Sequence, residues 1–168
     1  MNCEKIEFSY AQKLELAEWI AYENSGAVTG SIMLRERGIE LGREPNDIDI
    51  IVDDMSPDDI VLPPLCTKKE IEQNDDGYDV LARCYFLGLK IEFITDAEEL
   101  RKSSNIGFKL NCKFASIDGL LKAKKMYIEN DIEKLYIEKT KRDIEIIESH
   151  LNKTAAEAND TDNGRKRQ

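Results

Sequence analysis

Apolar positions recur along this chain with two periods, about 3.6 residues and about two residues, and these periods divide it into expected helices and strands. The helical period is clearest near the start, where Tyr10, Leu14, Ala17 and Ala21 fall on one side of a helix. In order, the pattern predicts a helix over 5–22, a strand over 27–30, a helix over 31–41, a strand over 47–54, two strands within 78–95, a strand over 107–114, and helices over 117–129 and 131–151. This mixture predicts an α/β or α+β fold, with a mixed β-sheet flanked by helices and a C-terminal helical pair.

Turn-forming residues and caps set the expected boundaries of these elements. Gly42 and Pro45 end the second helix, and Gly88 predicts a bulge or bend between the two strands around it. A hydroxyl at Ser116 and a carboxylate at Asp118 favour the start of a helix at that point.

Two stretches carry weaker structural signals. Residues 55–77 contain the turn-forming runs SPDD, LPPL and QNDDG, so we expect a loop with only short structure. Residues 154–168 lack apolar anchors and are expected to form a disordered tail. The remaining residues, 1–153, are expected to form a single domain, because a chain of 168 residues with 41% hydrophobic content can fill one core.

The charge of the chain narrows the class of partner. With 34 acidic and 24 basic residues, a net charge of −10 argues against a protein that coats nucleic acid non-specifically. Residues 1–100 contain 9 Lys/Arg and 23 Asp/Glu, whereas residues 101–145 contain 11 and 7. Acids from the first part and lysines from the second could together bind a metal ion and its phosphates, although solvated helix faces would give the same pattern.

Cysteine usage and hydropathy indicate a cytoplasmic protein. Cys3, Cys66, Cys84 and Cys112 form no C-x-x-C pair, which argues against a zinc ribbon or a redox motif and favours free thiols in a reducing compartment. No apolar run approaches the roughly 18 residues of a membrane span, and the start MNCEKIEF lacks the features of a secretory signal. We therefore expect no membrane partner.

The strand DIDIIV carries two acids on one face. Side chains alternate across a strand, so Asp47 and Asp49 project from one side while Ile48 and Ile50 project from the other. Two carboxylates held side by side repel each other unless a positive charge lies between them, and a divalent cation can supply it. Because His150 is the only histidine, an oxygen-ligated ion such as Mg²⁺ fits better than zinc with imidazole ligands.

A glycine and a serine precede this strand, in the stretch VTGSIML. A chain that turns at Gly30 into a helix directs the N–H groups of the first helical turn outward, where they can bind a phosphate. Gly30 permits close backbone approach, and Ser31 can add its hydroxyl. Alone, each motif is typical of an ordinary helix cap or strand end. Together, and with Arg43 four residues before Asp47, they predict a site for a metal-bound phosphate.

The combination of TGS and GREPNDIDIIV resembles the signature of the DNA polymerase β-like nucleotidyltransferase superfamily. Its R-x-x-x-D-x-D form is similar to that of small bacterial members, among them proteins of abortive-infection and toxin–antitoxin systems and antibiotic nucleotidyltransferases. In that family a third carboxylate comes from a neighbouring strand, which implies Glu92 in GLKIEFIT, with Asp79 and Asp96 as alternatives. Glu92 could otherwise be a solvent-facing residue of a strand that alternates with Lys90.

The resemblance extends more loosely over residues 26–147. The family's phosphate-contacting lysine implies Lys125 in SIDGLLKAKKMYIE, with Lys122 and Lys124 as near alternatives, although an exposed basic helix face would look the same. The family's closing Lys/Arg-Asp pair is matched by Lys141, Arg142 and Asp143. Asp143 could equally hold the last helix by a salt bridge.

The resemblance implies an enzyme that transfers a nucleoside monophosphate from a magnesium-bound nucleoside triphosphate to a hydroxyl acceptor and releases pyrophosphate. The catalytic and metal-binding residues would be Asp47, Asp49 and Glu92, with two Mg²⁺ ions expected and Mn²⁺ as an alternative. The nucleotide-binding residues would be Gly30, Ser31, Arg43 and Lys125.

The alternative is a catalytically inactive nucleotidyltransferase fold that serves as a nucleotide-binding or protein-interaction module. For an active enzyme the acceptor stays open between a small molecule such as an aminoglycoside, a tRNA end and a protein hydroxyl. Acceptor recognition would come from residues 55–77, from a second copy of the chain or from a partner protein, because no domain-sized segment follows Leu151.

Overall fold

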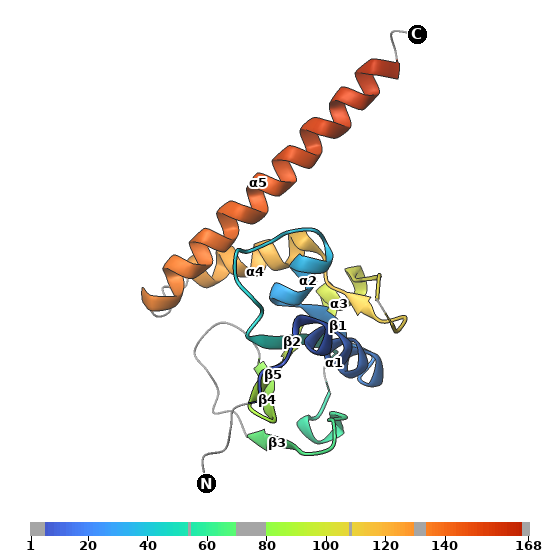
Figure 1. Cartoon of the computed structure of the whole chain (residues 1–168), viewed down its shortest axis with the longest axis vertical. Helices are drawn as coiled ribbons and strands as arrows, with labels where there is room; N and C mark the ends of the chain where they lie inside the picture. The colour runs from blue at the N-terminus through green and yellow to red at the C-terminus, as the bar shows by residue number, and fades with distance from the viewer. Residues whose placement is uncertain (1–5, 54, 70–79, 108, 130–133, 166–168) are drawn as a thin grey trace. The chain divides into compact units, whose positions relative to one another are not determined.

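The computed structural model describes residues 6–53, 55–69, 80–107, 109–129 and 134–165 (Figure 1). The chain divides into two compact units, residues 1–120 and residues 121–168. The first unit contains the sheet and the acidic strand, and the second contains most of helix α4 and all of helix α5.

The first unit is built on a seven-stranded sheet with the strand order β3-β4-β5-β2-β1-β7-β6. The pairs β2–β5 and β1–β7 are parallel and the other neighbours are antiparallel. The strands are β1 Ala27–Thr29, β2 Asp47–Val52, β3 Cys66–Lys69, β4 Val80–Phe86, β5 Leu89–Thr95, β6 Ser104–Asn105 and β7 Lys113–Phe114. The helices are α1 Tyr10–Glu23, α2 Gly30–Glu36, α3 Ala97–Lys102, α4 Ile117–Glu129 and α5 Lys134–Arg165, with a 3₁₀ turn η1 at Pro57–Asp59. The mixed α/β fold with C-terminal helices that the sequence predicts is confirmed.

One face of the central strands forms the core of the first unit. Ile48 and Ile50 of β2 and Ile91 and Phe93 of β5 are fully buried, and α1 contacts β1 and β2. Burying a side chain of this size contributes roughly 1.5–3 kcal/mol. Because side chains alternate, the residues between these apolar ones lie on the opposite face, where they are only half-buried.

A two-residue turn joins β4 to β5. Leu87 has φ 49° and Gly88 has φ 89°, which is the left-handed pair of conformations that suits the twist of a hairpin. Phe86 and Leu89 pair directly on either side of the turn. The bend expected at Gly88 is therefore a tight turn, and it sets the register of the hairpin.

Helix α2 is shorter than the sequence pattern predicts. It ends at Glu36 and not near residue 41, because Gly38 has φ 80° and the N–H of Ile39 donates to the carbonyl of Leu34 at 2.9 Å. A left-handed glycine with such a backward hydrogen bond ends a helix.

The strand predicted over 107–114 is present only as the short β7. The carboxylate of Glu18, which is fully buried on α1, accepts hydrogen bonds from the backbone N–H groups of Lys109 at 2.7 Å and Leu110 at 3.3 Å. These donors are therefore bound by a side chain and are not available to a neighbouring strand. Strand β7 instead pairs with β1 and with β6.

Both terminal helices differ from their predicted bounds. Helix α1 begins at Tyr10, behind a capping box formed by Ser9 and Gln12. Helix α5 continues to Arg165, although residues 154–168 were expected to be a disordered tail, and the run AAEA in this segment has high helix propensity. Among the helices described, none is long and apolar enough to cross a membrane.

Candidate functional site

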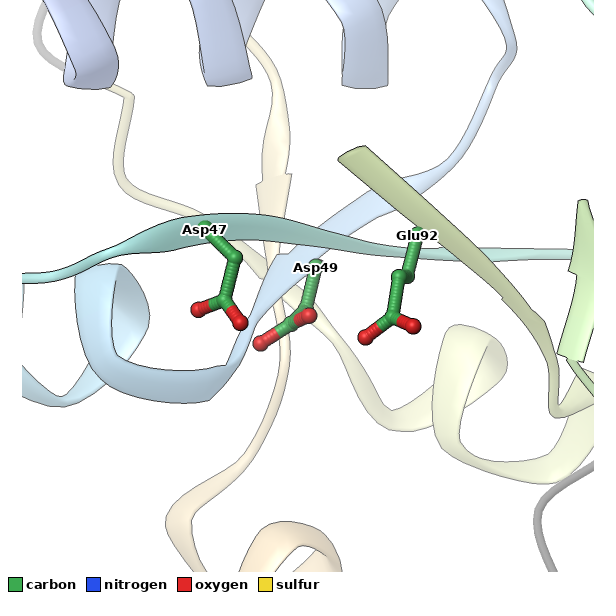
Figure 2. Close-up of side chains that lie close together, drawn as sticks. All are labelled: Asp47, Asp49 and Glu92. Carbon is green, nitrogen blue, oxygen red and sulfur yellow. The ribbon is translucent and has the colours of Figure 1, made fainter. Parts of the chain in front are cut away.

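Strands β2 and β5 bring the three predicted carboxylates together. Asp49 lies directly opposite Glu92 in this parallel pair, and Asp47, two residues earlier, points to the same face as Asp49. Figure 2 shows the three side chains next to one another, directed to one side of the sheet. Each can offer one oxygen so that these atoms all lie within 4.8 Å of one another. We refer to Asp47, Asp49 and Glu92 as the acidic triad.

The acidic triad belongs to a row of polar residues that crosses four strands. Arg83 of β4 lies opposite Glu92, and Thr29 of β1 lies opposite Asp49. Residues directly opposite in neighbouring strands share a face and lie close enough to interact. The row Arg83, Glu92, Asp49 and Thr29 is therefore continuous along one face of the sheet.

Two basic side chains offset part of the negative charge of the triad. Arg83 donates from Nε to Oε1 of Glu92 at 2.7 Å, and its Nη2 forms an ion pair with the same oxygen at 2.6 Å. Lys90 donates from Nζ to Oε2 of Glu92 at 3.0 Å and pairs with Oδ2 of Asp47 at 3.1 Å. Both oxygens of Glu92 therefore have a cationic partner, and Lys90 joins the acids of two strands.

The ammonium of Lys90 stays protonated at neutral pH. Partial burial, the largest single influence, lowers the pKa of Lys90. The hydrogen bond to Glu92 and the negative charges of Asp47 and Glu92 together outweigh that influence and raise the pKa of Lys90 to about 12. Its side chain is 34% exposed, so the ammonium lies at the open surface of the sheet.

Gly30 packs directly against the triad. Its φ is 65°, and a Cβ atom added there would lie 2.1 Å from Oδ2 of Asp49. Ser31 follows in the first turn of α2, and the N-cap residue Thr29 makes no side-chain hydrogen bond to that turn. The predicted Gly-Ser turn is thus adjacent to the acids, while phosphate binding by it stays a prediction.

Three further residues predicted for this site have different outcomes. Arg43 is half-buried in the connection between α2 and β2. Asp96, one alternative to Glu92, instead caps α3, a helix that the pattern missed, by accepting from the N–H of Glu99 at 2.9 Å. Asp79, the other alternative, lies outside the described residues. Of the three candidates for the third carboxylate, Glu92 is the one that the structure places beside Asp49.

The lysines predicted to contact phosphate belong to the second unit. Lys125 pairs with Glu148 of α5 at 2.6 Å, and both side chains are exposed. Lys124 pairs with Asp143 of α5 at 3.0 Å, and the side chain of Asp143 is only 1% exposed. Asp143 therefore joins α5 to α4 through a buried ion pair, as the salt-bridge interpretation predicts. Phosphate contact by Lys125 stays a prediction.

The oxygen ligands of the triad fit a hard divalent cation. Mg²⁺ binds oxygen at about 2.0–2.1 Å, so ligands on opposite sides of one ion lie about 4.2 Å apart. The three oxygens, all within 4.8 Å of one another, need only small side-chain rotations to match that span. The ammonium of Lys90 already binds one oxygen of Asp47 and one of Glu92, so it would compete with an ion for these two acids.

Reasoning from the sequence missed Arg83 and Lys90 as partners of the triad. A signal was present, because counting outward from the turn at Leu87 and Gly88 places Arg83 opposite Glu92. The sequence argument considered a divalent cation as the source of the positive charge beside the acids. Two side chains of the chain itself supply positive charge.

No protein-family model matches the chain, and a search among curated proteins gives no match. The resemblance to the nucleotidyltransferases therefore rests on the motif residues alone.

Proposed function

We propose that this chain is a metal-dependent nucleotidyltransferase, which transfers a nucleoside monophosphate from a nucleoside triphosphate to a hydroxyl acceptor. The observation that carries the proposal is the acidic triad, in which three carboxylates from two parallel neighbouring strands converge within 4.8 Å. The triad also lies beside the Gly-Ser turn, where a Cβ on Gly30 would meet Asp49. This combination is what a resemblance to the DNA polymerase β-like superfamily implies.

The proposal gives each acid a role. Asp47 and Asp49 would bind Mg²⁺ or Mn²⁺, and Glu92 would complete the ligands for a second ion. When bound, such ions would lower the pKa of the acceptor hydroxyl and offset charge on the phosphate oxygens. Arg83 holds Glu92 through Oε1, while Oε2 of Glu92 pairs with Lys90.

The reaction is a displacement at the α-phosphorus. The acceptor oxygen forms a bond to that phosphorus while the bond from phosphorus to the oxygen of the β-phosphate breaks, and pyrophosphate leaves. Gly30 would let a phosphate approach the backbone, and Arg43 would bind phosphate oxygens. Removing a fixed charge at such a site typically lowers the rate on the order of 10²-fold.

One observation favours a second candidate, an inactive module of the same fold. Arg83 and Lys90 offset the acids without an ion, so the triad can persist in a protein that has no catalytic activity. Such a module would bind a nucleotide or a basic protein. A basic protein would be attracted by the acidic character of the chain, which has a net charge of −10.

Thermal melts test the nucleotide site directly. Wild type and Asp49→Asn are melted with each of the four ribonucleoside triphosphates, with Mg²⁺ and with chelator. A ligand at about 100 times its Kd adds roughly 2.7 kcal/mol to stability, so we expect a clear shift for one triphosphate. The shift should require Mg²⁺ and be lost in Asp49→Asn.

A control and a second assay separate the two candidates. Asp53→Asn makes the same charge change at an exposed position just after β2 and should leave the shift intact. Release of pyrophosphate from the stabilising triphosphate in the presence of an acceptor supports the enzyme. A shift of the melting temperature without pyrophosphate release for any acceptor favours the nucleotide-binding module. If no triphosphate shifts the melting temperature, both the enzyme and the nucleotide-binding module are contradicted.

A further inference from the structure

Lys90 lies where a cation would have to bind. Its ammonium is 3.1 Å from Oδ2 of Asp47 and 3.0 Å from Oε2 of Glu92, which are the acids of two different strands. We propose that Lys90 couples metal binding to triphosphate binding: its ammonium opposes a bare divalent cation and moves to the phosphates when the cation arrives with a triphosphate. This inference rests on the proposed function.

The geometry places the ammonium of Lys90 in competition with a divalent metal ion. The ligand oxygens of the triad all lie within 4.8 Å of one another, and Lys90 binds oxygens of two of its members. Both oxygens of Glu92 already have a cationic partner, so an ion bound to Glu92 would share an oxygen with Arg83 or Lys90 and would repel that group strongly at this range. Of these two side chains, Lys90 is the one that a divalent cation would displace.

The charge balance disfavours a bare ion. Arg83 and Lys90 already offset negative charge at Glu92 and Asp47. A divalent cation on its own would have to replace the ammonium of Lys90 there, and the displaced ammonium would lose the two carboxylates with which it pairs. A triphosphate supplies several negative oxygens, so the metal and the triphosphate each make binding of the other more favourable.

Lys90 is the side chain that moves, and Arg83 is the one that stays. Arg83 contacts a single oxygen of Glu92 through two guanidinium nitrogens, by a hydrogen bond from Nε at 2.7 Å and an ion pair from Nη2 at 2.6 Å, and this rigid planar group has little freedom to turn away. Lys90 is a point charge on a flexible stem and is 34% exposed, so its ammonium can turn from the carboxylates toward a ligand above the sheet.

The first experiment uses Mn²⁺ alone. Calorimetric titration compares wild type, Lys90→Gln and Lys90→Arg, with Lys102→Gln as the control because Lys102 pairs with Glu98 on its own helix. Lys90→Gln should bind Mn²⁺ roughly tenfold more tightly or better, while Lys90→Arg and the control stay near wild type. Equal affinities for wild type and Lys90→Gln would overturn the proposal.

The second experiment repeats the titration with the α,β-methylene analogue of each of the four ribonucleoside triphosphates, because these analogues cannot be transferred. In wild type the triphosphate should tighten Mn²⁺ binding, and in Lys90→Gln that gain should largely disappear. If the gain is the same in both proteins, coupling through Lys90 is overturned and the proposed function stands. If the four triphosphates leave Mn²⁺ affinity unchanged in both, the proposed function fails and the coupling with it.

Thermal stability gives a further readout, in which each variant without Mn²⁺ is its own reference. Without Lys90 the carboxylates of Asp47 and Glu92 lose their shared partner, so apo Lys90→Gln should melt below wild type. Mn²⁺ should raise its melting temperature more than that of wild type, and Lys90→Met should behave in the same way. If Mn²⁺ does not raise the melting temperature of Lys90→Gln or Lys90→Met, the proposal is contradicted.

Discussion

Gly30 lies so close to Asp49 that a Cβ atom at residue 30 would sit 2.1 Å from Oδ2 of the aspartate. The φ of 65° at Gly30 adds a second reason for glycine, because side chains disfavour the left-handed region. The Gly-Ser turn and the acid of β2 are therefore packed against each other and form one structural unit.

Gly30→Ala should destabilise the first unit and disturb the acidic triad. Gly42→Ala is the matched control, since Gly42 has φ 70° but an added Cβ meets nothing within 4 Å. Both substitutions carry the left-handed cost of about 1–2 kcal/mol, so their difference reports the contact with Asp49. We expect Gly30→Ala to cost at least about 1 kcal/mol more in urea unfolding, because Asp49 has to shift. Equal losses of unfolding free energy for the two variants would show that Asp49 can move away from residue 30 without cost.

Glu18 should matter far more to stability than its exposed neighbour Glu15. The buried carboxylate of Glu18 accepts from two backbone N–H groups, whereas Glu15, 57% exposed, pairs with the ammonium of Lys109. Glu18→Gln replaces charge-assisted hydrogen bonds and should lower the free energy of unfolding by about 1–3 kcal/mol. Glu15→Gln should change it by less than about 1 kcal/mol in the same denaturation experiment. Similar values for the two would contradict the anchoring role of Glu18.

Cys112 should make the stability of the chain fall at alkaline pH. Burial, and then the negative charge of Glu18, raise the pKa of the Cys112 thiol from 9.0 to about 11. Between these values the unfolded chain has released the thiol proton and the native chain has kept it, so stability is lost as pH rises from about 9 to about 11. Urea unfolding of reduced protein across this range should show a smaller decline for Cys112→Ala than for wild type. Parallel declines would remove Cys112 as the cause.

Two neighbouring lysines of α4 give a matched test of buried and exposed ion pairs. Lys124 pairs with the buried Asp143, and Lys125 pairs with the exposed Glu148. Asp143→Asn leaves the ammonium without its partner and should cost about 3–5 kcal/mol. Glu148→Gln should cost at most about 1 kcal/mol, and helix content followed by circular dichroism during thermal unfolding measures both. The reverse order would mean that the pair at Lys124 is solvent-screened.

The faces of the strands could be predicted from the sequence, because alternation is local. Asp47 and Asp49 share a face for that reason alone, and so do Lys90 and Glu92. The pairing of β2 with β5 could not be derived in the same way, because about 40 residues separate Asp49 from Glu92 in the chain. The family resemblance supplied that neighbour, and the structure places Glu92 opposite Asp49.

The two elements whose bounds the sequence pattern predicted wrongly, the strand at 107–114 and helix α2, differ from the prediction for a common physical reason. The strand expected at 107–114 has the right alternation, but the buried carboxylate of Glu18 binds two of its N–H groups from a helix more than 90 positions away. Helix α2 has a continuing apolar pattern past Glu36, but the conformation of Gly38 ends it. In both cases a backbone hydrogen-bond partner decided the outcome, and the hydrophobic pattern contains no information on that partner.

The two-residue turn at Leu87 and Gly88 has a consequence for electrostatics. It aligns β4 with β5 so that Arg83 faces Glu92. A slip of one residue would turn Arg83 toward the apolar side and bring a neutral neighbour to the carboxylate, because adjacent residues point to opposite faces. The cost of keeping three acids together would then rise sharply. The length of this turn therefore determines whether positive charge lies next to Glu92. In this way it influences how much negative charge the sheet can hold.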